Sequence, residues 1–446
     1  MQSRSSSEDV IPINSRRAAN ALARKLRLQG GSAAEWYDLG TFLSRSKQFA
    51  DAKQAFDTAH RKAPCNSQYV RAQANALSGM RRYEEALSVR RARPYSLPMD
   101  IAVIADDLKN LKRYEDAIAL VQQAQETGKG SAWSRAVEGF AQLYLGNYAR
   151  GFALLEDRFE ADLTPAPRNV PKKRWERDLT IGLRLLVLPD QGLGDDLLML
   201  RFGRSLAGAG VIGTFVARKP LKRLLEASDI GLKVIGEPYG AADFDAWCPV
   251  CSLPHALHFN AAPPKPLTLT VPEDALARGK RIVGTSGSAF KIGMCWTGNA
   301  KYPRNEIRSV SPEAFCGIAA RPDVQLFSLY KGPAIDELRQ SSAGERIIDA
   351  ASDDQDLADA AGVISALDLV ISTDTSLVHL AASLGKPVWN LLPFESFWQY
   401  GPEGDSTPWY PSMRLFRQPG PGDWDSVFRK VETELDALLQ ARSGGT

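Results

Sequence analysis

A ten-residue phrase recurs four times in the first third of the chain, and it constrains the fold more than any other feature. The copies are KQFADAKQAF, RRYEEALSVR, KRYEDAIALV and GNYARGFALL. Each has an aromatic residue at its third position, so Phe49, Tyr83, Tyr114 and Tyr148 follow one another at spacings of 34, 31 and 34 residues. A period near 34 residues is typical of stacked helix pairs, none of which can bury its apolar face alone. The first third is therefore predicted to be a helical array.

The first repeat carries further features of the tetratricopeptide repeat (TPR). Trp36, Leu39 and Gly40 form the pattern W-x-x-L-G ahead of the aromatic position, and Pro64 closes the unit. We predict TPR helical repeats over residues 16–160. Stacked TPR pairs leave a concave surface that solenoid proteins use for binding. We interpret this surface as a groove for a protein or peptide; a purely structural cap on the next domain is the alternative.

The periodicity changes after a proline-rich, basic linker at 161–177. Short apolar runs such as 183–188 then alternate with helical stretches, which favours parallel, doubly wound sheets. We predict two Rossmann-like lobes, 178–285 and 290–420, with ligands bound at the carboxyl ends of their strands. A last helix at 423–442 is expected to cross back to the first lobe. The predicted fold class is thus α + α/β, a helical solenoid followed by two Rossmann-like lobes.

Charge and cysteine usage exclude several functional classes. The 55 basic and 52 acidic residues leave a net charge of only +3, so nucleic acid is not an expected partner. No run of about 18 apolar residues occurs, so no membrane span is predicted. The five irregularly spaced cysteines argue against a disulfide framework and favour a cytoplasmic protein. Cys248 and Cys251 form a lone CxxC that no second CxxC completes, so we interpret them as packing cysteines beside a proline-containing turn and predict no metal; a zinc site that includes the nearby His255 and His258 is the alternative.

The first lobe has one candidate for acid–base chemistry. The turn DQGLGDD at 190–196 lies between a predicted strand and a predicted helix. Gly192 and Gly194 would let backbone N–H groups approach a ligand at a helix start, so both glycines are assigned to donor binding. Asp195 at that start could take a proton from an acceptor hydroxyl, or it could serve only as a helix cap.

Two constellations in the second lobe suit a ligand that carries phosphate. The first follows the predicted strand KIGMC and includes a positive charge, and the second follows the predicted strand DLVIST at a helix start. The residues assigned to donor binding here are Thr297, Gly298, Asn299, Arg308, Asp374, Thr375, Ser376 and His379. The alternatives are a solvated basic loop for the first constellation and a satisfied core histidine in the second.

These residues also carry a resemblance. The run DTSLVHLAASLGKPV at 374–388 and GLGDD at 192–196 resemble the ADP-heptose:lipopolysaccharide heptosyltransferase family. From about residue 35 to 440, the chain resembles bacterial TPR-containing glycosyltransferase-like proteins. The resemblance implies a GT-B fold, inverting and metal-independent transfer, a nucleotide-sugar donor in the second lobe, and Asp195 as the base. The donor-phosphate contacts that it implies are Thr297, Arg308, Thr375, Ser376 and His379.

The sequence thus predicts an inverting glycosyltransferase that moves a sugar from a nucleotide-sugar donor to an acceptor hydroxyl. The TPR groove is expected to recruit the protein that carries this hydroxyl. The nucleotide sugar is a substrate, so no cofactor is expected. The rival hypothesis is a non-catalytic TPR adaptor whose glycosyltransferase-like half is only a scaffold. Saturable binding of a nucleotide sugar separates the two hypotheses, because a pure scaffold has none.

Overall fold

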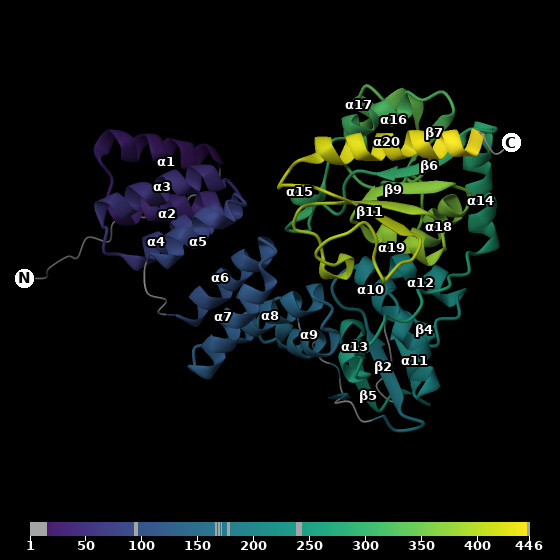
Figure 1. The fold of residues 1–446 in the computed structure, drawn as a ribbon, viewed down its shortest axis with the longest axis horizontal. Helices are drawn as coiled ribbons and strands as arrows, with labels where there is room; N and C mark the ends of the chain where they lie inside the picture. Colours follow the sequence, from purple (N-terminus) through teal and green to yellow (C-terminus); the bar gives the residue numbers. More distant parts are fainter. Residues whose placement is uncertain are drawn as a thin grey trace, which may run out of the picture. The chain divides into compact units, whose positions relative to one another are not determined.

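The computed structural model divides into two compact units, one ending at Val137 and the other beginning at Glu138 (Figure 1). The structure describes residues 16–92, 97–165, 167, 170, 172–175, 179–237 and 243–443. The Ser-rich start of the chain and part of the linker expected at 161–177 lie outside the described residues. No helix within the described ranges is long and apolar enough to cross a membrane.

Helix hairpins build the first unit, as the repeated phrase predicts. Its helices are α1 (Arg16–Gln29), α2 (Ala33–Arg45), α3 (Phe49–Lys62), α4 (Ser67–Gly79), α5 (Tyr83–Arg91), α6 (Pro98–Asn110) and α7 (Tyr114–Glu126). The repeated aromatics Phe49, Tyr83 and Tyr114 each begin the second helix of a hairpin. The repeat therefore marks the same structural position each time.

Close packing and a tight turn explain why the hairpins form. A Cβ on Gly40 of α2 would lie 2.5 Å from the ring of Phe56, so the absence of a side chain lets α2 and α3 approach. Two residues before each aromatic, the chain adopts a left-handed conformation, with φ of 57° at Lys47 and 62° at Arg81 and Lys112. A left-handed residue ends one helix and lets the chain fold back into the next.

The fourth repeat belongs in part to the second unit, because the division between the units falls inside α8. The repeat consists of α8 (Ala132–Tyr144), α9 (Tyr148–Leu154) and the 3-10 turn η1 (Leu155–Arg158). A Cβ on either Gly139 or Gly151 would lie 3.0 Å from the carbonyl oxygen of the other, so α8 and α9 touch through backbone. The ring of Tyr148 packs edge-on against Trp409, and the Trp409 Nε1–H donates to the Tyr148 hydroxyl over 3.2 Å. Helix α9 is thus part of the core of the second unit.

The first sheet of the second unit is parallel, in the order β1-β5-β2-β3-β4. Its strands are β1 (Lys173–Arg174), β2 (Arg184–Leu188), β3 (Ile212–Val216), β4 (Lys233–Ile235) and β5 (Ala246–Pro249). Its helices and 3-10 turns are α10 (Leu193–Met199), η2 (Leu200–Phe202), α11 (Gly203–Gly208), α12 (Lys219–Glu226), η4 (Val250–Ser252) and α13 (Leu253–Ala256). Strand β2 is buried after its first residue and matches the apolar run predicted at 183–188.

The second sheet is also parallel, in the order β11-β10-β9-β6-β7-β8. Its strands are β6 (Phe290–Cys295), β7 (Val324–Ser328), β8 (Ile347–Asp349), β9 (Leu369–Thr373), β10 (Val388–Leu392) and β11 (Met413–Arg417). The helices of this part are α14 (Glu273–Val283), α15 (Asn305–Arg308), α16 (Cys316–Ala319), α17 (Ile335–Gln340), α18 (Leu357–Ser365), α19 (Ser376–Ser383) and α20 (Trp424–Ser443), with the 3-10 turns η5 (Gly284–Ser286), η6 (Pro312–Phe315), η7 (Gly344–Arg346) and η8 (Trp398–Tyr400). Helix hairpins followed by two parallel sheets confirm the predicted fold class.

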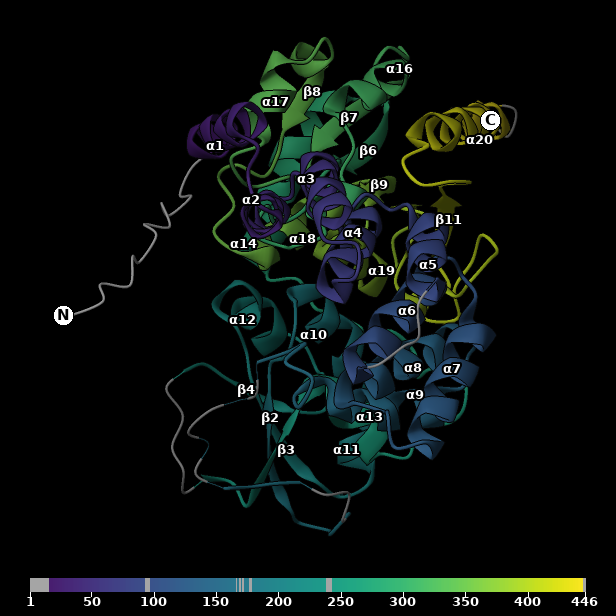
Figure 2. The same ribbon diagram turned by 90° about the vertical axis from the view of Figure 1, so that its left-hand side faces the viewer.

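The two sheets define two lobes whose helices meet. Figures 1 and 2 show the sheets one above the other, with α10 and α12 of the first lobe beside α19 and α18 of the second. Because the strands of each sheet are parallel, their carboxyl ends share one edge, where ligands of such sheets bind.

Helix α20 contradicts the prediction that the last helix crosses back to the first lobe. The ring of Phe428 on α20 packs against Phe315, with centroids 5.0 Å apart. Arg414 on β11 pairs with Glu434 on α20 over 2.8 Å. These partners belong to the second lobe, so apolar burial and charge pairing both hold α20 there.

Helix α14 follows the first sheet in sequence but packs on α18. A Cβ on Gly279 would overlap the carbonyl oxygen of Gly362, and a Cβ on Gly362 would overlap that of Ala275. The two helices therefore touch backbone to backbone, which only glycine permits.

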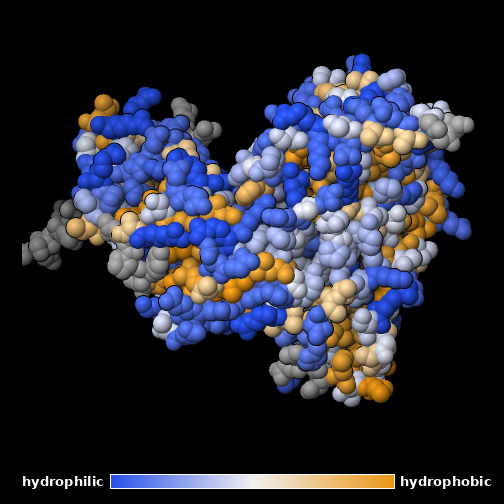
Figure 3. All heavy atoms as spheres, in the orientation of Figure 1, coloured by the Kyte–Doolittle hydropathy of each residue, from blue (hydrophilic) through white to orange (hydrophobic). Residues whose placement is uncertain are grey.

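The surface gives a first indication of where the site does not lie. Figure 3 shows hydrophilic residues over much of the face seen in Figure 1, with apolar residues in several places that include the lower end of the first lobe. Ile181, which precedes β2, is 86% exposed, and Ile212, which begins β3, is 60% exposed. Both lie at the amino ends of the strands, opposite to the edge at which ligands bind.

Candidate functional site

The two motifs found in the sequence face each other across the lobes. Helix α10 begins directly after Gly192, and α19 begins directly after Thr375. A Cβ on Gly194 of α10 would lie 2.9 Å from Cδ2 of His379 and 3.5 Å from the Cα of Ser376, both on α19. Glycine at position 194 therefore lets the start of α10 rest on the start of α19. This contact brings Asp195 close to the predicted donor residues.

Asp195 is the third residue of α10, and its carboxylate Oδ2 accepts from the backbone N–H of Gly192 over 2.9 Å. The helix-capping role considered in the sequence is thus present. Burial raises the pKa of Asp195 to about 6, and the nearby carboxylates Asp190 and Asp374 add to the rise. A carboxylate with that pKa is mostly ionised at neutral pH yet more basic than an ordinary aspartate. It can cap the helix and still accept a proton from a ligand.

Asp196, the next residue, is held differently. Its carboxylate is buried and pairs with Arg218 over 2.8 Å. The backbone N–H of Asp190 donates to the same carboxylate over 3.4 Å. Burial raises the pKa of Asp196 to about 8, although Arg218 opposes the rise. Asp195 is half-buried, so of these two neighbours it is the one with access to a ligand.

Arg308 lies at the centre of the second-lobe residues. Its Nη1 donates to the backbone oxygen of Asp374 over 2.6 Å, and its Nε donates to Asn305 Oδ1 over 3.1 Å. Its guanidinium lies 4.5 Å from the ring centroid of Tyr302. A Cβ on Gly298 would overlap Arg308 Nη2, so glycine makes room for the guanidinium. Arg308 thus links the loop after β6 to the end of β9.

The predicted hydroxyl groups already have partners within the chain. The Thr297 hydroxyl lies 2.7 Å from that of Ser309 and accepts from Asn305 Nδ2 over 2.9 Å. The Thr375 hydroxyl caps α19 by accepting from the N–H of Leu377 over 3.3 Å. These bonds orient the two strand ends toward the site.

Asn299 and Ser376 lie nearer to the surface. Asn299 is exposed, and its Oδ1 accepts from the backbone N–H of Lys301 over 3.0 Å, within its own loop. Ser376 is half-buried at the first position of α19. The structure therefore brings Ser376 to the contact between the lobes and leaves Asn299 on the loop surface.

Two tyrosines that the sequence did not single out fix Asp374 and His379. The Tyr400 hydroxyl donates to Asp374 Oδ1 over 2.6 Å, and burial raises the pKa of Asp374. His379 is buried, and its Nδ1 lies 3.1 Å from the Tyr410 hydroxyl. Burial lowers the pKa of His379 to about 3, so the imidazole is neutral. Nothing local marks these tyrosines, because their roles arise from contacts between distant parts of the chain.

A small cavity opens beside Asp195. Its walls come from α8, α9, η1, α10 and the loop before it, η4, and the start of η8 with the residue before it. The lining residues are Phe140, Phe152, Leu155, Arg158, Gln191, Asp195, Met199, Cys251, Phe397 and Trp398. The fourth repeat and both lobes therefore all contribute to the surroundings of Asp195.

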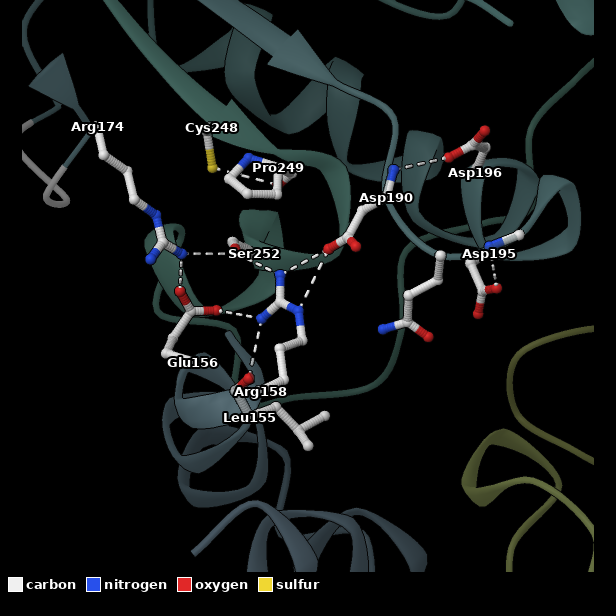
Figure 4. Close-up of polar contacts among 12 residues, drawn as sticks. Leu155, Glu156, Arg158, Arg174, Asp190, Asp195, Asp196, Cys248, Pro249 and Ser252 are labelled. Atoms are coloured by element: carbon white, nitrogen blue, oxygen red, sulfur yellow. Dashed lines mark hydrogen bonds and ion pairs between the residues drawn. The ribbon is translucent and has the colours of Figure 1, made fainter. Parts of the chain in front are cut away.

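A buried charge network supports one wall of this cavity (Figure 4). All five N–H groups of Arg158 are hydrogen-bonded: to Asp190 Oδ2 over 2.7 and 3.3 Å, to Ser252 Oγ over 2.8 Å, to Leu155 O over 2.9 Å and to Glu156 Oε1 over 3.0 Å. Arg158 thereby ties the end of the fourth repeat to the loop that leads to Asp195. The sequence did not identify Arg158, whose partners lie far from it along the chain.

The CxxC cysteines show no sign of a ligand. Cys248 lies on β5 and Cys251 in η4, and both are buried free thiols. Burial raises the pKa of each thiol, which disfavours the thiolate that a metal requires. Among the described residues, no group of three or more His, Cys, Asp or Glu side chains is placed to hold a metal ion.

Comparison with known proteins supports the resemblance seen in the sequence. The family described as Glycosyltransferase family 9 (heptosyltransferase) matches residues 354–393, which hold α18, β9, α19 and β10. Protein FlbA of Caulobacter vibrioides is 28% identical over 357 residues, which are 73% of this chain and 59% of that protein. The chain thus spans about three fifths of the length of this relative. The family match confirms the resemblance predicted from the run at 374–388.

Three solved structures match parts of this chain. E. coli ADP-heptose lps heptosyltransferase II matches with a TM-score of 0.45 and 16% identity, over 58% of this chain and 100% of that one. A family 9 glycosyl transferase from Veillonella parvula matches with a TM-score of 0.44 and 15% identity, over 58% and 98% of the two chains. A Thermobaculum terrenum O-GlcNAc transferase matches with a TM-score of 0.29 and 14% identity, over 86% and 85%.

Proposed function

We propose that this protein is an inverting glycosyltransferase that moves a sugar from a nucleotide-sugar donor to an acceptor hydroxyl without a metal ion. The observation that carries the proposal is the contact between α10 and α19. It sets a carboxylate of raised pKa opposite a helix start that is flanked by an arginine. A base on one wall and an anion-binding wall on the other are what such a transfer requires. The match to Glycosyltransferase family 9 at 354–393 supports glycosyl transfer in general.

The proposed chemistry is a single displacement. Asp195 takes the proton from the acceptor hydroxyl while that oxygen forms a bond to the anomeric carbon of the sugar. The bond from the anomeric carbon to the diphosphate oxygen breaks, and its electron pair leaves with the diphosphate. One displacement inverts the anomeric configuration. The pKa of about 6 suits Asp195 to this step. The carboxylate is mostly ionised at neutral pH, and its pKa lies close enough to that pH for efficient proton transfer.

The second lobe would hold the departing diphosphate. Arg308 supplies positive charge, and the partial positive charge at the N-terminus of α19, where Ser376 is the first residue, would favour an anion there. If the Nδ1 of neutral His379 accepts from Tyr410, its Nε2–H is a donor that faces the start of α10. Thr297 and Gly298 would shape the loop around the phosphates, and Asp374 would orient Arg308 through its backbone oxygen.

The helix hairpins of the first unit would recruit the acceptor protein. The architecture supports this role, because stacked helix hairpins present an extended surface on which a peptide can bind. All five cysteines are free thiols, which agrees with a cytoplasmic protein. The acceptor hydroxyl would then belong to a serine or threonine of the recruited protein.

Donor binding tests the proposal. The melting temperature of the full chain would be measured against UDP-, GDP-, ADP-, CMP- and dTDP-sugars with EDTA present. At about one hundred times Kd, a bound donor adds about 2.7 kcal/mol to the stability of the folded state. We expect one donor to give a saturable rise that Arg308→Ala abolishes and Asp195→Asn retains.

Lys301→Ala is the matched control, because it removes a positive charge from an exposed position of the same loop. It should leave the donor-dependent rise intact. A chain that shows no saturable rise with any donor would refute the proposal and favour the non-catalytic adaptor.

A further inference from the structure

Arg201 is a buried cation without a carboxylate of its own. It lies in η2 of the first lobe and is 3% exposed. Its Nε donates to Leu198 O over 2.8 Å, and its Nη1 donates to Pro264 O over 3.1 Å and to Trp409 O over 2.8 Å. No carboxylate pairs with it among the residues that the structure describes. Buried charges are ordinarily paired, so this one acts on its surroundings with little compensation.

Tyr410 of the second lobe lies beside this cation. The guanidinium carbon of Arg201 is 4.7 Å from the centroid of the Tyr410 ring. Burial raises the pKa of Tyr410, and the positive charge of Arg201 opposes that rise. A guanidinium has N–H donors and no acceptor, so a hydroxyl group beside it turns its oxygen toward the charge and its proton away.

His379 is the neighbour that can accept this proton. Its Nδ1 lies 3.1 Å from the Tyr410 hydroxyl. Burial lowers the pKa of His379 to about 3, and the charge of Arg201 adds to the fall, so the ring is neutral at neutral pH. A neutral imidazole has one nitrogen that accepts and one that donates. Because the Tyr410 hydroxyl directs its proton to Nδ1, the proton of the ring is on Nε2.

The Nε2 atom of His379 is turned toward the candidate site. A Cβ on Gly194 would lie 3.3 Å from it, so Nε2 faces the start of α10, one residue before Asp195. His379 is 5% exposed, yet within the described ranges its Nε2 has no hydrogen-bond partner. Buried N–H groups are nearly always hydrogen-bonded, so this one points to a ligand oxygen.

We propose that Arg201 and Tyr410 are positioning residues that keep the proton of His379 on Nε2. The inference rests on the proposed function, because it concerns the same site. The Nε2–H donates to an oxygen of the departing diphosphate as negative charge develops there. The same tautomer leaves Nε2 without a free lone pair, so His379 does not compete with Asp195 for the proton of the acceptor hydroxyl.

The tautomer of His379 can be measured without any ligand. The chain has four histidines, so the long-range proton–nitrogen NMR spectrum of the histidine-labelled full chain contains few signals. The spectrum of His379→Gln identifies those that belong to His379. At neutral pH we expect a neutral ring with its proton on Nε2 and a hydrogen-bonded, unprotonated Nδ1. A proton on Nδ1, or a doubly protonated ring, overturns the inference.

Two substitutions of Arg201 separate its charge from its contacts with the backbone carbonyls. Arg201→Met removes the charge that orients the Tyr410 hydroxyl, so the fraction of His379 with its proton on Nε2 should fall. Arg201→Lys retains the charge and should retain the wild-type tautomer. The signals of the other histidines show whether each variant is folded. A folded Arg201→Met that keeps the wild-type tautomer overturns the positioning role and leaves Arg201 as a purely structural link.

Tyr410→Phe is the smaller change and carries the test if Arg201→Met does not fold. It removes the hydroxyl but keeps the ring beside Arg201, so the Nδ1 signal of His379 should move to that of a nitrogen without a hydrogen bond. Tyr330→Phe, at another buried tyrosine of the second lobe, is the matched control and should leave the signal in place. An Nδ1 signal that Tyr410→Phe does not move overturns the inference.

Kinetics connect the tautomer to the transfer. Tyr410→Phe should lower kcat by about two- to tenfold, which is the effect of one ordinary hydrogen bond. The donor concentration that gives half of the rise in melting temperature should not change, because the Nε2–H bond strengthens only in the transition state. An unchanged kcat in a chain whose Nδ1 signal has moved overturns the role of the tautomer in transfer.

The outcomes distinguish this inference from the proposed function. Donor binding together with the other tautomer overturns the inference alone. Absence of donor binding overturns the proposed function, and with it the role of the Nε2–H in transfer. The spectra need neither donor nor acceptor, so they still decide whether Arg201 and Tyr410 set the tautomer.

Discussion

Replacing Arg158 by methionine should destabilise the second unit more than any surface charge change. The Arg158 and Asp190 side chains are 2% and 3% exposed, and they meet over 2.7 Å. Methionine fills much of the volume of arginine but leaves Asp190 buried without its cation. It also leaves Ser252 Oγ and the Leu155 carbonyl without this donor. Breaking one partner of a buried pair costs about 3–5 kcal/mol.

Urea unfolding followed by tryptophan fluorescence measures this loss, since seven of the nine tryptophans lie after residue 137. The matched control is Arg184→Met in the same lobe. Arg184 and Asp245 meet over 2.6 Å, but their side chains are 48% and 43% exposed. An exposed pair contributes far less to stability than a buried one, because water screens its charges. The difference between the two variants therefore isolates the effect of burial.

A second comparison tests the pairing itself. Arg158→Met combined with Asp190→Leu removes both charges, so the double variant should be more stable than the sum of the two single losses predicts. The reasoning is refuted if Arg158→Met costs no more than Arg184→Met, or if the two single losses simply add.

Three further predictions concern the site and the lobes. The transfer rate should rise as pH increases through about 6, because burial raises the pKa of Asp195 to about 6 and the base must be deprotonated. In steady-state assays, Asp195→Asn should remove this pH dependence and lower kcat by about 10²–10⁴-fold. Arg223→Met should lower the melting temperature and make it less sensitive to salt, because Arg223 on α12 pairs with Asp356 over 2.9 Å across the lobes; equal salt sensitivity of both proteins would contradict this. Gly279→Ala should cost about 1–3 kcal/mol in urea unfolding because α14 touches α18 there, whereas Gly284→Ala, with nothing within 4 Å, should cost little.

The sequence predicted the helices that are marked by a repeated phrase and the strands that are marked by an apolar run. The aromatic positions marked the hairpins because each begins a second helix, where it packs against the neighbouring helix. Strands β2, β6, β7, β9 and β10 were recognisable because they are almost wholly buried and read as apolar runs.

Short or irregular elements escaped prediction because they lack such patterns. Strands β1 and β8 are two and three residues long, too short to establish a period. β5 contains Cys248 and Pro249 and resembled a turn. The lobe on which α20 packs was not predictable because it depends on Phe315, which lies more than one hundred residues before Phe428, its partner on α20.

The sequence predicted the types of residue in the candidate site, but it did not predict the residues that hold them in place. Glycine and aspartate at a strand–helix junction, and threonine and serine at another, are local patterns that sequence shows directly. Arg158, Tyr400 and Tyr410 act through contacts that only the folded chain creates. The cavity beside Asp195 is likewise built from side chains of separate parts of the chain.

The packing of α14 on α18 determines where the chain can be cut. A fragment that ends at residue 285 would carry α14 without the surface that covers it, and a fragment that begins at 290 would leave Gly362 and its neighbours uncovered. The second lobe should therefore be produced from about residue 272 onward, with α14 at its amino end. In an exchange of lobes between relatives, α14 should travel with the second sheet, so that the two glycines that fit each other stay in the same piece.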